Sequence, residues 1–182
     1  HKGGFGFKLH FQGFEVHSSI AYQGVSAIMM AAKFIEWAND VNAESAAATP
    51  NAINAQFDPP YTSLHFGTIT GGTANNITAK DCHVSMDVRL VPGDDKAAWE
   101  SRIHAKLAEI EAQMQAVQPT TAISAIPFFG IPGLTTEENG TAEELARRLT
   151  GDNGTHVVSY GTEAGQFQER GYSAVVCGPG DI

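Results

Sequence analysis

Two segments of the chain, residues 5–12 and residues 82–90, alternate strictly between apolar and polar side chains. Successive side chains of a β-strand point to opposite faces of a sheet, so this period of two predicts strands that are buried on one face only. The apolar face carries Phe5, Phe7, Leu9 and Phe11 from the first strand and Cys82, Val84, Met86, Val88 and Leu90 from the second. The polar face carries Lys8, His10, Gln12, His83, Asp87 and Arg89. The chain must therefore cover one face of a sheet and leave the other open.

Two further segments have the period of an α-helix. Apolar residues recur every three or four positions in residues 25–38 and again in residues 99–117, which predicts two amphipathic helices. Asp95 stands where it can cap the second helix, and Pro119 ends it. The apolar stripes of both helices are expected to cover the apolar face of the sheet.

The remaining segments complete a familiar arrangement. Residues 62–70 and 121–126 are rich in strand-forming residues, whereas residues 39–60 are rich in Ala, Asn, Asp and Pro and are expected to form a long surface connection. The resulting order is strand, helix, strand, strand, helix, strand, which is the split-βαβ or ferredoxin-like pattern. We therefore expect an α+β fold, with one antiparallel sheet and both helices on one of its faces.

The composition changes near residue 130, which divides the chain into residues 1–130 and residues 131–182. In the second part, Thr141 and Glu144 are predicted to form a capping box for a helix. Gly151 stands where such a helix would end. The second part is thus expected to be a separate α/β segment that follows the ferredoxin-like domain.

This second part looks incomplete as a folding unit. Residues 155–159 and 174–177 are predicted as short strands, and the segment 161–165 is predicted to turn into a short helix. These few elements cannot enclose a core of their own. We therefore expect them to belong to a larger α/β domain whose remainder is absent. The chain also begins with His rather than Met, which suggests that it was cut from something longer.

Charge and cysteine content narrow the class of protein. The formal net charge is −9, which repels phosphate backbones and anionic lipids and disfavours nucleic-acid and membrane partners. No apolar run reaches the roughly 20 residues that a membrane span needs, and we expect neither a span nor a signal peptide. Cys82 and Cys177 lack the spacing of a metal site and are interpreted as free thiols of a protein core. We expect a cytoplasmic protein, because thiols stay reduced in that compartment.

No complete catalytic centre can be assembled from residue spacing. A catalytic metal needs several His, Asp or Glu side chains that converge on one point. The seven histidines form no His-x-Asp, His-x-His or His-Glu-x-x-His pattern, and no phosphate-binding loop or nucleophilic serine motif is present. We therefore assign no metal ligand in this chain.

Four local features are nevertheless suited to a binding or catalytic site. They are His17 in a polar loop after the first strand, the loop 71–76 with the sequence GGTANN, Arg89 beside Asp87, and Glu163 ahead of a helix. Each also has an ordinary structural interpretation. These are a surface histidine, a flexible hairpin, a salt-bridged arginine, and a carboxylate favoured at a helix N-terminus. Residue spacing alone leaves both interpretations open.

In their order along the chain, these features resemble a known family. The residues that carry the resemblance are HSS at 17–19, FDPPY at 57–61, GTITGGTANNI at 67–77, RLVPGDD at 89–95, GTEAG at 161–165 and VCGPG at 176–180. The chain resembles the zinc-dependent deacetylase and exopeptidase family that includes acetylornithine deacetylase, succinyl-diaminopimelate desuccinylase, aminoacylase and carboxypeptidase G. It is most similar to the acetylornithine deacetylase branch, and the resemblance extends over nearly the whole chain.

The resemblance implies a domain organisation and a cofactor. In this family a catalytic α/β domain is interrupted by a ferredoxin-like lid, and the lid forms a homodimer. Residues 1–130 then resemble the lid and residues 131–182 part of the catalytic domain. Two zinc ions, with cobalt as an alternative, act in the full-length enzyme, and their ligands match no position of this chain. The chain alone is therefore expected to bind no metal and to be inactive.

The resemblance also implies roles for individual residues. The family hydrolyses the amide of N-acyl amino acids, with N-acetylornithine of arginine biosynthesis as the favoured substrate. His17 matches a donor that reaches into the partner subunit's active site and stabilises the tetrahedral oxyanion. Asn76 and Arg89 match positions that hold the substrate's carboxylate. Glu163 stands where a carboxylate would favour an ornithine-like amine.

Two other classes of function fit the same topology. One is a stand-alone ferredoxin-like module that dimerises or binds a small ligand, but the unfinished segment after residue 130 argues against it. The other is an RNA-binding sheet, which needs aromatic side chains on its open face. Phe5, Phe7 and Phe11 instead share the face that the helices should cover, and the negative charge is unfavourable.

Overall fold

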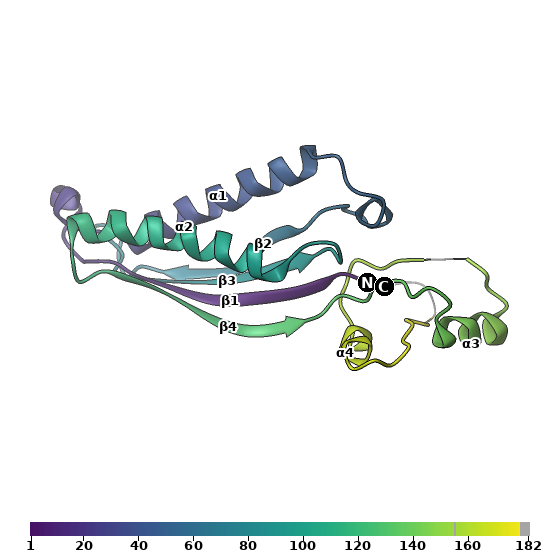
Figure 1. The fold of residues 1–182 in the computed structure, drawn as a ribbon. Coiled ribbons are helices and arrows are strands. Elements are labelled where there is room, and N and C mark those ends of the chain that lie inside the picture. Colours follow the sequence, from purple (N-terminus) through teal and green to yellow (C-terminus); the bar gives the residue numbers. More distant parts are fainter. Residues whose placement is uncertain (155, 179–182) are drawn as a thin grey trace.

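The computed structural model describes residues 1–154 and 156–178. Its main part is a four-stranded antiparallel sheet with strand order β2-β3-β1-β4, and two long helices cover one face of it (Figure 1). The elements are β1 (Gly3–Gln12), α1 (Ala27–Ala47), β2 (Ser63–Gly71), β3 (Asp81–Leu90), α2 (Lys96–Val117) and β4 (Ala122–Ile131). Short 3₁₀ turns cover Ser18–Gln23 and Asn54–Gln56. This is the predicted α+β, ferredoxin-like arrangement, and the prediction of the fold class is confirmed.

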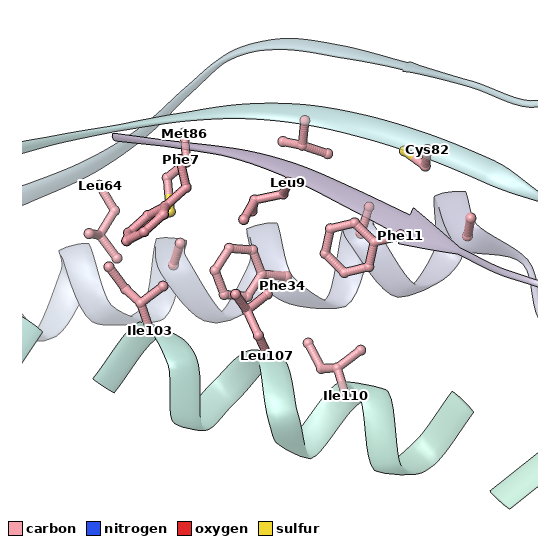
Figure 2. Close-up of a cluster of buried hydrophobic side chains, with 14 of the residues drawn as sticks. Phe7, Leu9, Phe11, Phe34, Leu64, Cys82, Met86, Ile103, Leu107 and Ile110 are labelled. Atoms are coloured by element: carbon pink, nitrogen blue, oxygen red, sulfur yellow. The ribbon is translucent and has the colours of Figure 1, made fainter. Parts of the chain in front are cut away.

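The alternation of β1 and β3 places their apolar sides in the core. Residues 3–12 of β1 pair in register with residues 90–81 of β3, so Phe7 lies opposite Met86 and Phe11 opposite Cys82. Figure 2 shows these side chains pointing toward Phe34 of α1 and toward Ile103, Leu107 and Ile110 of α2. All of them are buried. The predicted apolar face is therefore the core, because both helices cover it.

The helices follow the predicted apolar spacing. The buried residues of α2 are Ile103, Leu107, Ile110 and Met114, which repeat every three or four positions. The carboxylate of Asp95 accepts a hydrogen bond from the Ala97 amide at 2.9 Å, as expected of the N-cap. Across the described residues, no helix combines the length and the apolar character that a bilayer span needs.

The helix α1 is longer than predicted. We expected it to end at residue 38 and to be followed by a surface connection, but it continues to Ala47. Alanine is the strongest helix former, and Val41 adds a further buried contact. The Asn42 side chain also exchanges two hydrogen bonds with the backbone of Leu64, at 2.8 and 2.9 Å, which ties this part of α1 to β2. Such a contact between distant segments has no local sequence signal.

The segment after β4 differs from the prediction in several ways. The helix α3 (Thr141–Thr150) ends at Gly151 as expected, with Gly151 in the left-handed region at φ 75°. Its N-cap is Gly140 and not Thr141, and the predicted capping box does not form. The hydroxyl of Ser173 instead accepts a hydrogen bond from the Ala142 amide at 3.0 Å. A residue distant in the sequence thus satisfies one of the free N–H groups at the start of the helix.

Neither predicted strand of this segment forms. Thr155 lies outside the described residues, and residues 156–159 and 174–177 are irregular, with Val175 and Val176 partly exposed. A strand needs a series of backbone hydrogen bonds to a neighbouring strand. Within the described residues the Lys2 amide donates one such bond to the carbonyl of Val158 at 3.3 Å, and no strand pairing follows from it. The motif at 176–180 continues into Pro179 and Gly180, which also lie outside the described residues. The predicted short helix is present as α4 (Ala164–Glu169).

Glu137 connects the irregular parts of this segment. Its carboxylate accepts hydrogen bonds from the Ser173 hydroxyl at 2.6 Å, from the Gln168 amide at 3.1 Å and from the Ala174 backbone at 3.2 Å. These hydrogen bonds lower the pKa of Glu137 below its usual value, because they favour the charged carboxylate. The sequence analysis had assigned no role to this residue.

The two cysteines differ in exposure. Both are unpaired; Cys82 is buried in the core as predicted, but Cys177 is exposed and its interpretation as a core thiol is wrong. Burial raises the pKa of Cys82, so the reactive thiolate is disfavoured there. We expect Cys82 to resist alkylation by iodoacetamide in the native protein at pH 8.5 and to react after unfolding in guanidinium. Mass spectrometry of peptides would check this, and rapid native labelling of Cys82 would contradict the described packing.

Candidate functional site

His17 lies in a loop that leaves β1 and is tied to the loop after β2. The backbone of His17 forms an isolated antiparallel bridge with Ile77, and the amide of Ser18 donates to the carbonyl of Asn76 at 2.8 Å. Gly13 permits the chain to make this turn, since a Cβ there would lie 2.1 Å from the carbonyl oxygen of Val25. The structure therefore brings together His17 and Asn76, two predicted site residues that are 59 positions apart in the sequence.

Thr78 holds these two loops together. Its hydroxyl accepts a hydrogen bond from the Val16 amide at 2.8 Å and donates one to the carbonyl of Phe14 at 2.8 Å. Its own amide donates to the carbonyl of Val16 at 3.0 Å. The sequence analysis did not identify Thr78 as a site residue. The only sequence feature that could indicate this role is a hydroxyl side chain close to the Asn-rich loop, because a hydroxyl can both donate and accept hydrogen bonds.

The hydrogen bonds of the His17 ring determine which nitrogen carries the proton. The backbone amide of Ser19 donates to Nδ1 of His17 at 3.2 Å, and the Ser19 hydroxyl lies 2.8 Å from the same atom. An amide can only donate, so Nδ1 acts as an acceptor and the proton of the neutral ring resides on Nε2. The His17 side chain is exposed. It can therefore present an Nε2–H donor to a group outside its own chain.

Arg89 lies near the opposite end of the sheet. It pairs with Gly4 of β1 and with Ser63 of β2, whereas the loop of Asn76 follows Gly71, which pairs with Cys82. Strands rise by about 3.3 Å per residue, so the seven steps from Cys82 to Arg89 span about 23 Å. The four predicted site residues therefore do not form one cluster within this chain.

Other motif segments gather at the Arg89 end. Lys2 is only 1% exposed, and its ammonium donates to the carbonyls of Pro59 and Tyr61 at 2.6 and 3.1 Å. Burial lowers the pKa of Lys2, and the nearby charge of Asp58 opposes that shift. The hydroxyl of Ser159 donates to the carbonyl of Asp58 at 2.6 Å. The segment 57–61 is thus held against the start of β1 and against the part of the chain beyond β4.

The segment that contains Glu163 and its neighbouring glycines lies at the same end of the sheet as Arg89. A Cβ on Gly161 would lie 3.5 Å from the carbonyl of Lys2 and from the side chain of Ile131, so the segment packs beside the start of β1 and the end of β4. The Glu163 side chain is exposed and makes no capping hydrogen bond with α4. The structure therefore places Arg89 and the Glu163 segment at one end of the sheet, and His17 and Asn76 at the other.

The described part of the chain does not suit a catalytic metal. Among these residues, no group of three or more His, Cys, Asp or Glu side chains is arranged to hold an ion. His10 and His83 stack with ring centroids 4.3 Å apart, and His10 Nε2 lies 2.7 Å from the Asp81 carboxylate. These side chains pair with each other on the open face of the sheet.

Comparison with known sequences identifies a domain family. The sequence profile described as "Peptidase dimerisation domain" matches residues 1–115. A protein named acetylornithine deacetylase from Myxococcus xanthus is 29% identical over 177 residues, which are 96% of this chain and 44% of that protein. The protein of the same name from Erwinia tasmaniensis is 30% identical over 182 residues, 100% of this chain and 45% of that protein. The chain thus spans less than half the length of these curated relatives.

Solved structures share the fold. Aminopeptidase PepT from Bacillus cereus superposes with a TM-score of 0.66 at 19% identity, over 93% of this chain and 42% of that one. A putative aminohydrolase from methicillin resistant Staphylococcus aureus superposes with a TM-score of 0.70 at 16% identity, over 93% of this chain and 41% of that one. At these identities the likeness concerns the fold alone.

Proposed function

The chain belongs to the peptidase dimerisation domain family, and on this premise we propose that it forms the lid and dimer contact of an enzyme that hydrolyses N-acyl amino acids. The relatives that match it along nearly its whole length carry the name acetylornithine deacetylase. N-acetylornithine, an intermediate of arginine biosynthesis, is therefore the first substrate to test. These matches extend through residues 131–182, which favours the enzyme over a stand-alone dimerisation or ligand-binding module.

The proposed lid comprises residues 1–130, and the proposed part of the catalytic domain comprises residues 131–182. The last strand of the sheet, β4, ends at Ile131, which supports a boundary at this position. The chain returns beside its own start here, because the amide of Leu134 donates to the carbonyl of His1 at 3.0 Å. Both connections between the proposed lid and the catalytic domain therefore lie next to each other. A lid connected in this way can move as one unit.

The observation that carries the proposal is the separation of the candidate site residues. His17 and Asn76 lie beyond one end of the sheet and Arg89 lies near the other, about 23 Å away by strand length. An N-acyl amino acid is much shorter than this distance, so one substrate cannot contact both groups of a single chain. If both groups act on one substrate, they come from two copies of the chain.

A dimer through the edge strand β2 supplies the second copy. The other edge strand, β4, contains Pro127, which has no N–H to donate, whereas both edge strands have one irregularity in register. The proline obstructs edge-to-edge pairing through β4. The β2 edge has no proline, and α1 beside it presents Met29, which is 67% exposed, while β2 presents Ile69, which is 50% exposed. Pairing of two β2 strands with contacts between α1 helices would cover these apolar side chains.

Each proposed site residue has a role that suits its chemistry. His17 donates its Nε2–H to the oxyanion that develops in the partner's site, and the hydrogen bond from the Ser19 amide to Nδ1 supports that tautomer. Asn76 and Arg89 bind the substrate's carboxylate, and a guanidinium suits this because it can pair with both carboxylate oxygens. Glu163 favours an amine on the substrate's side chain.

The proposed reaction also requires a metal, which other residues must hold. Zinc, or cobalt in its place, would activate the attacking water in the full-length enzyme. The described residues offer no arrangement for such an ion, so the role proposed for this chain is limited to closing the site, binding the substrate and stabilising the oxyanion. We place the enzyme in the cytoplasm, where free thiols such as Cys82 stay reduced.

The test is hydrolysis of N-acetylornithine by the full-length protein that carries this chain, with added zinc or cobalt. We expect deacetylation by the full-length protein and none by residues 1–182 alone. N-acetyl derivatives of other amino acids, assayed in parallel, would determine the substrate. Full-length protein that binds metal but hydrolyses no N-acyl amino acid would rule out the proposed activity. Turnover by residues 1–182 alone would rule out the role as a lid.

A further inference from the structure

We propose that Asp87 is a positioning residue that holds the guanidinium of Arg89 in the orientation in which it binds the substrate's carboxylate. This inference rests on the carboxylate-binding role of Arg89 in the proposed function, and it adds a residue to which no role has been given. Three observations support the inference. They are the contact between the side chains of Asp87 and Arg89, the glycines of β1 that lie opposite them, and the buried oxygen of Asp87 that makes no hydrogen bond within the described residues.

The contact engages only one nitrogen of the guanidinium. Asp87 and Arg89 are two positions apart on β3, so both side chains lie on the open face of the sheet. Nε of Arg89 donates to Oδ2 of Asp87 at 2.9 Å. Within the described part of the chain, neither terminal nitrogen of Arg89 has a hydrogen-bond partner. The two nitrogens that pair with a carboxylate in the bidentate arrangement include these terminal ones, so they remain available while Nε is held.

Within the described residues, no side chain of the neighbouring strands takes part in this contact. On β2, Ser63 lies opposite Arg89 and His65 lies opposite Asp87, but neither makes a hydrogen bond to the pair. Gly4 of β1 lies opposite Arg89, and Gly6 lies opposite Asp87. The ring of Phe129 covers this bare backbone, since a Cβ on Gly6 would lie 2.4 Å from it and a Cβ on Gly4 would lie 3.4 Å from it. An apolar ring cannot take a hydrogen bond away from the guanidinium. The orientation of Arg89 is therefore determined by Asp87.

Among the residues that the structure describes, Arg89 is the one hydrogen-bond partner of the Asp87 carboxylate. Its Oδ1 atom is buried and makes no hydrogen bond within the described residues, while the side chain as a whole is 25% exposed. A buried oxygen without a partner is unfavourable unless the charge is compensated nearby. The charge of Arg89 is the compensation present here, so the two side chains constrain each other strongly.

Positioning and neutralisation predict opposite effects. A carboxylate next to Arg89 reduces the positive potential that attracts the substrate, so if it acted only through its charge, its removal would strengthen binding. If Asp87 instead holds the guanidinium in place, its removal frees a long side chain that must be ordered again for each substrate. Binding of the carboxylate would then weaken. The sign of the change in KM distinguishes the two roles.

The experiment compares substrates with and without the carboxylate in the full-length enzyme. We expect Asp87→Ala to raise KM for N-acetylornithine by about 10-fold, the effect of losing one well-placed charge-assisted hydrogen bond, with kcat nearly unchanged. The KM for N-acetylornithine amide, which lacks the carboxylate, should not change. Asp87→Asn keeps an acceptor for Nε and should raise KM less. This variant also retains the volume of the side chain and covers the case in which Asp87→Ala fails to fold.

A second arginine–carboxylate pair provides the control. Glu44 of α1 accepts a hydrogen bond from Arg102 of α2 at 2.8 Å on the helical side of the sheet. Glu44→Ala removes a charge of the same sign and should leave both KM values as in the wild type. An unchanged or lowered KM for N-acetylornithine in Asp87→Ala would overturn the positioning role.

The outcomes separate this inference from the proposed function. If the wild-type enzyme does not distinguish N-acetylornithine from its amide, the carboxylate-binding role of Arg89 is wrong, and the inference falls with it. If the wild type distinguishes them and Arg89→Ala loses that preference, the role of Arg89 stands. An Asp87→Ala enzyme that then keeps the preference would overturn only the positioning role.

Discussion

Replacement of His17 by alanine in the full-length enzyme is expected to lower kcat by about 100-fold or more, because removal of one oxyanion donor typically has this effect. The metal content should stay the same, since among the described residues His17 belongs to no group of His, Cys, Asp or Glu side chains that could hold an ion. The KM should change little, because the donor acts mainly on the charge that develops in the transition state. Steady-state kinetics together with metal analysis of the same sample would check all three quantities.

His10 provides a matched control for this variant. It is also a histidine of the proposed lid, but it lies on the open face of the sheet and contacts Asp81 and His83. His10→Ala should leave kcat unchanged within about 2-fold, the typical range for surface substitutions. A His17→Ala enzyme with normal turnover would remove His17 from the mechanism.

The origin of His17 in the partner subunit can be tested by mixing two inactive variants. His17→Ala lacks the donor from the partner, and Arg89→Ala lacks the carboxylate-binding residue. In a mixed dimer, one active site contains both substitutions and the other contains neither. Random exchange of subunits makes half of the dimers mixed, so we expect recovery of about one quarter of the wild-type activity. If His17 and Arg89 acted within one chain, each site of the mixed dimer would carry one substitution and no activity would return.

The regular part of the fold was predictable because its signals are local. The alternation of β1 and β3 predicts which face is buried, and the register follows once the two strands pair, as with Phe7 opposite Met86. The end of α1 was wrong because the bonds between Asn42 and Leu64 that support it join distant segments. The strand proposed at residues 174–177 was wrong because an apolar run forms a strand only where another strand can pair with it.

The candidate site was predictable in composition but not in arrangement. The motif resemblance identified His17, Asn76 and Arg89 as candidates, yet nothing in their spacing indicates that the first two meet through a bridge between loops and the third lies near the far end of the sheet. The hydrogen bond from Nε of Arg89 to Asp87 is the exception, since two positions on one strand share a face. Thr78 was missed because its role depends on both loops at once.

Charges placed at the β2 edge are expected to separate the dimer. Met29→Asp combined with Ile69→Asp would put like charges at a self-complementary interface, where each substitution occurs twice because the dimer is symmetric. We expect the dissociation constant of the dimer to rise by about 100-fold or more, since unpaired charges are costly to bury. Sedimentation velocity over a range of concentrations would measure it. Ile126→Asp is the matched control, because Ile126 is 61% exposed on the other edge strand, β4.

This separation of the dimer also tests the source of the oxyanion donor. A monomer has no partner His17, so its kcat should fall by about as much as that of His17→Ala, roughly 100-fold. Addition of His17→Ala to the monomeric variant should then cause no further loss, because the donor is already absent from the site. Two variants that remove the same interaction are not additive. A further large loss would mean that His17 acts within its own chain, and a fully active monomer would mean that the site is complete without a partner.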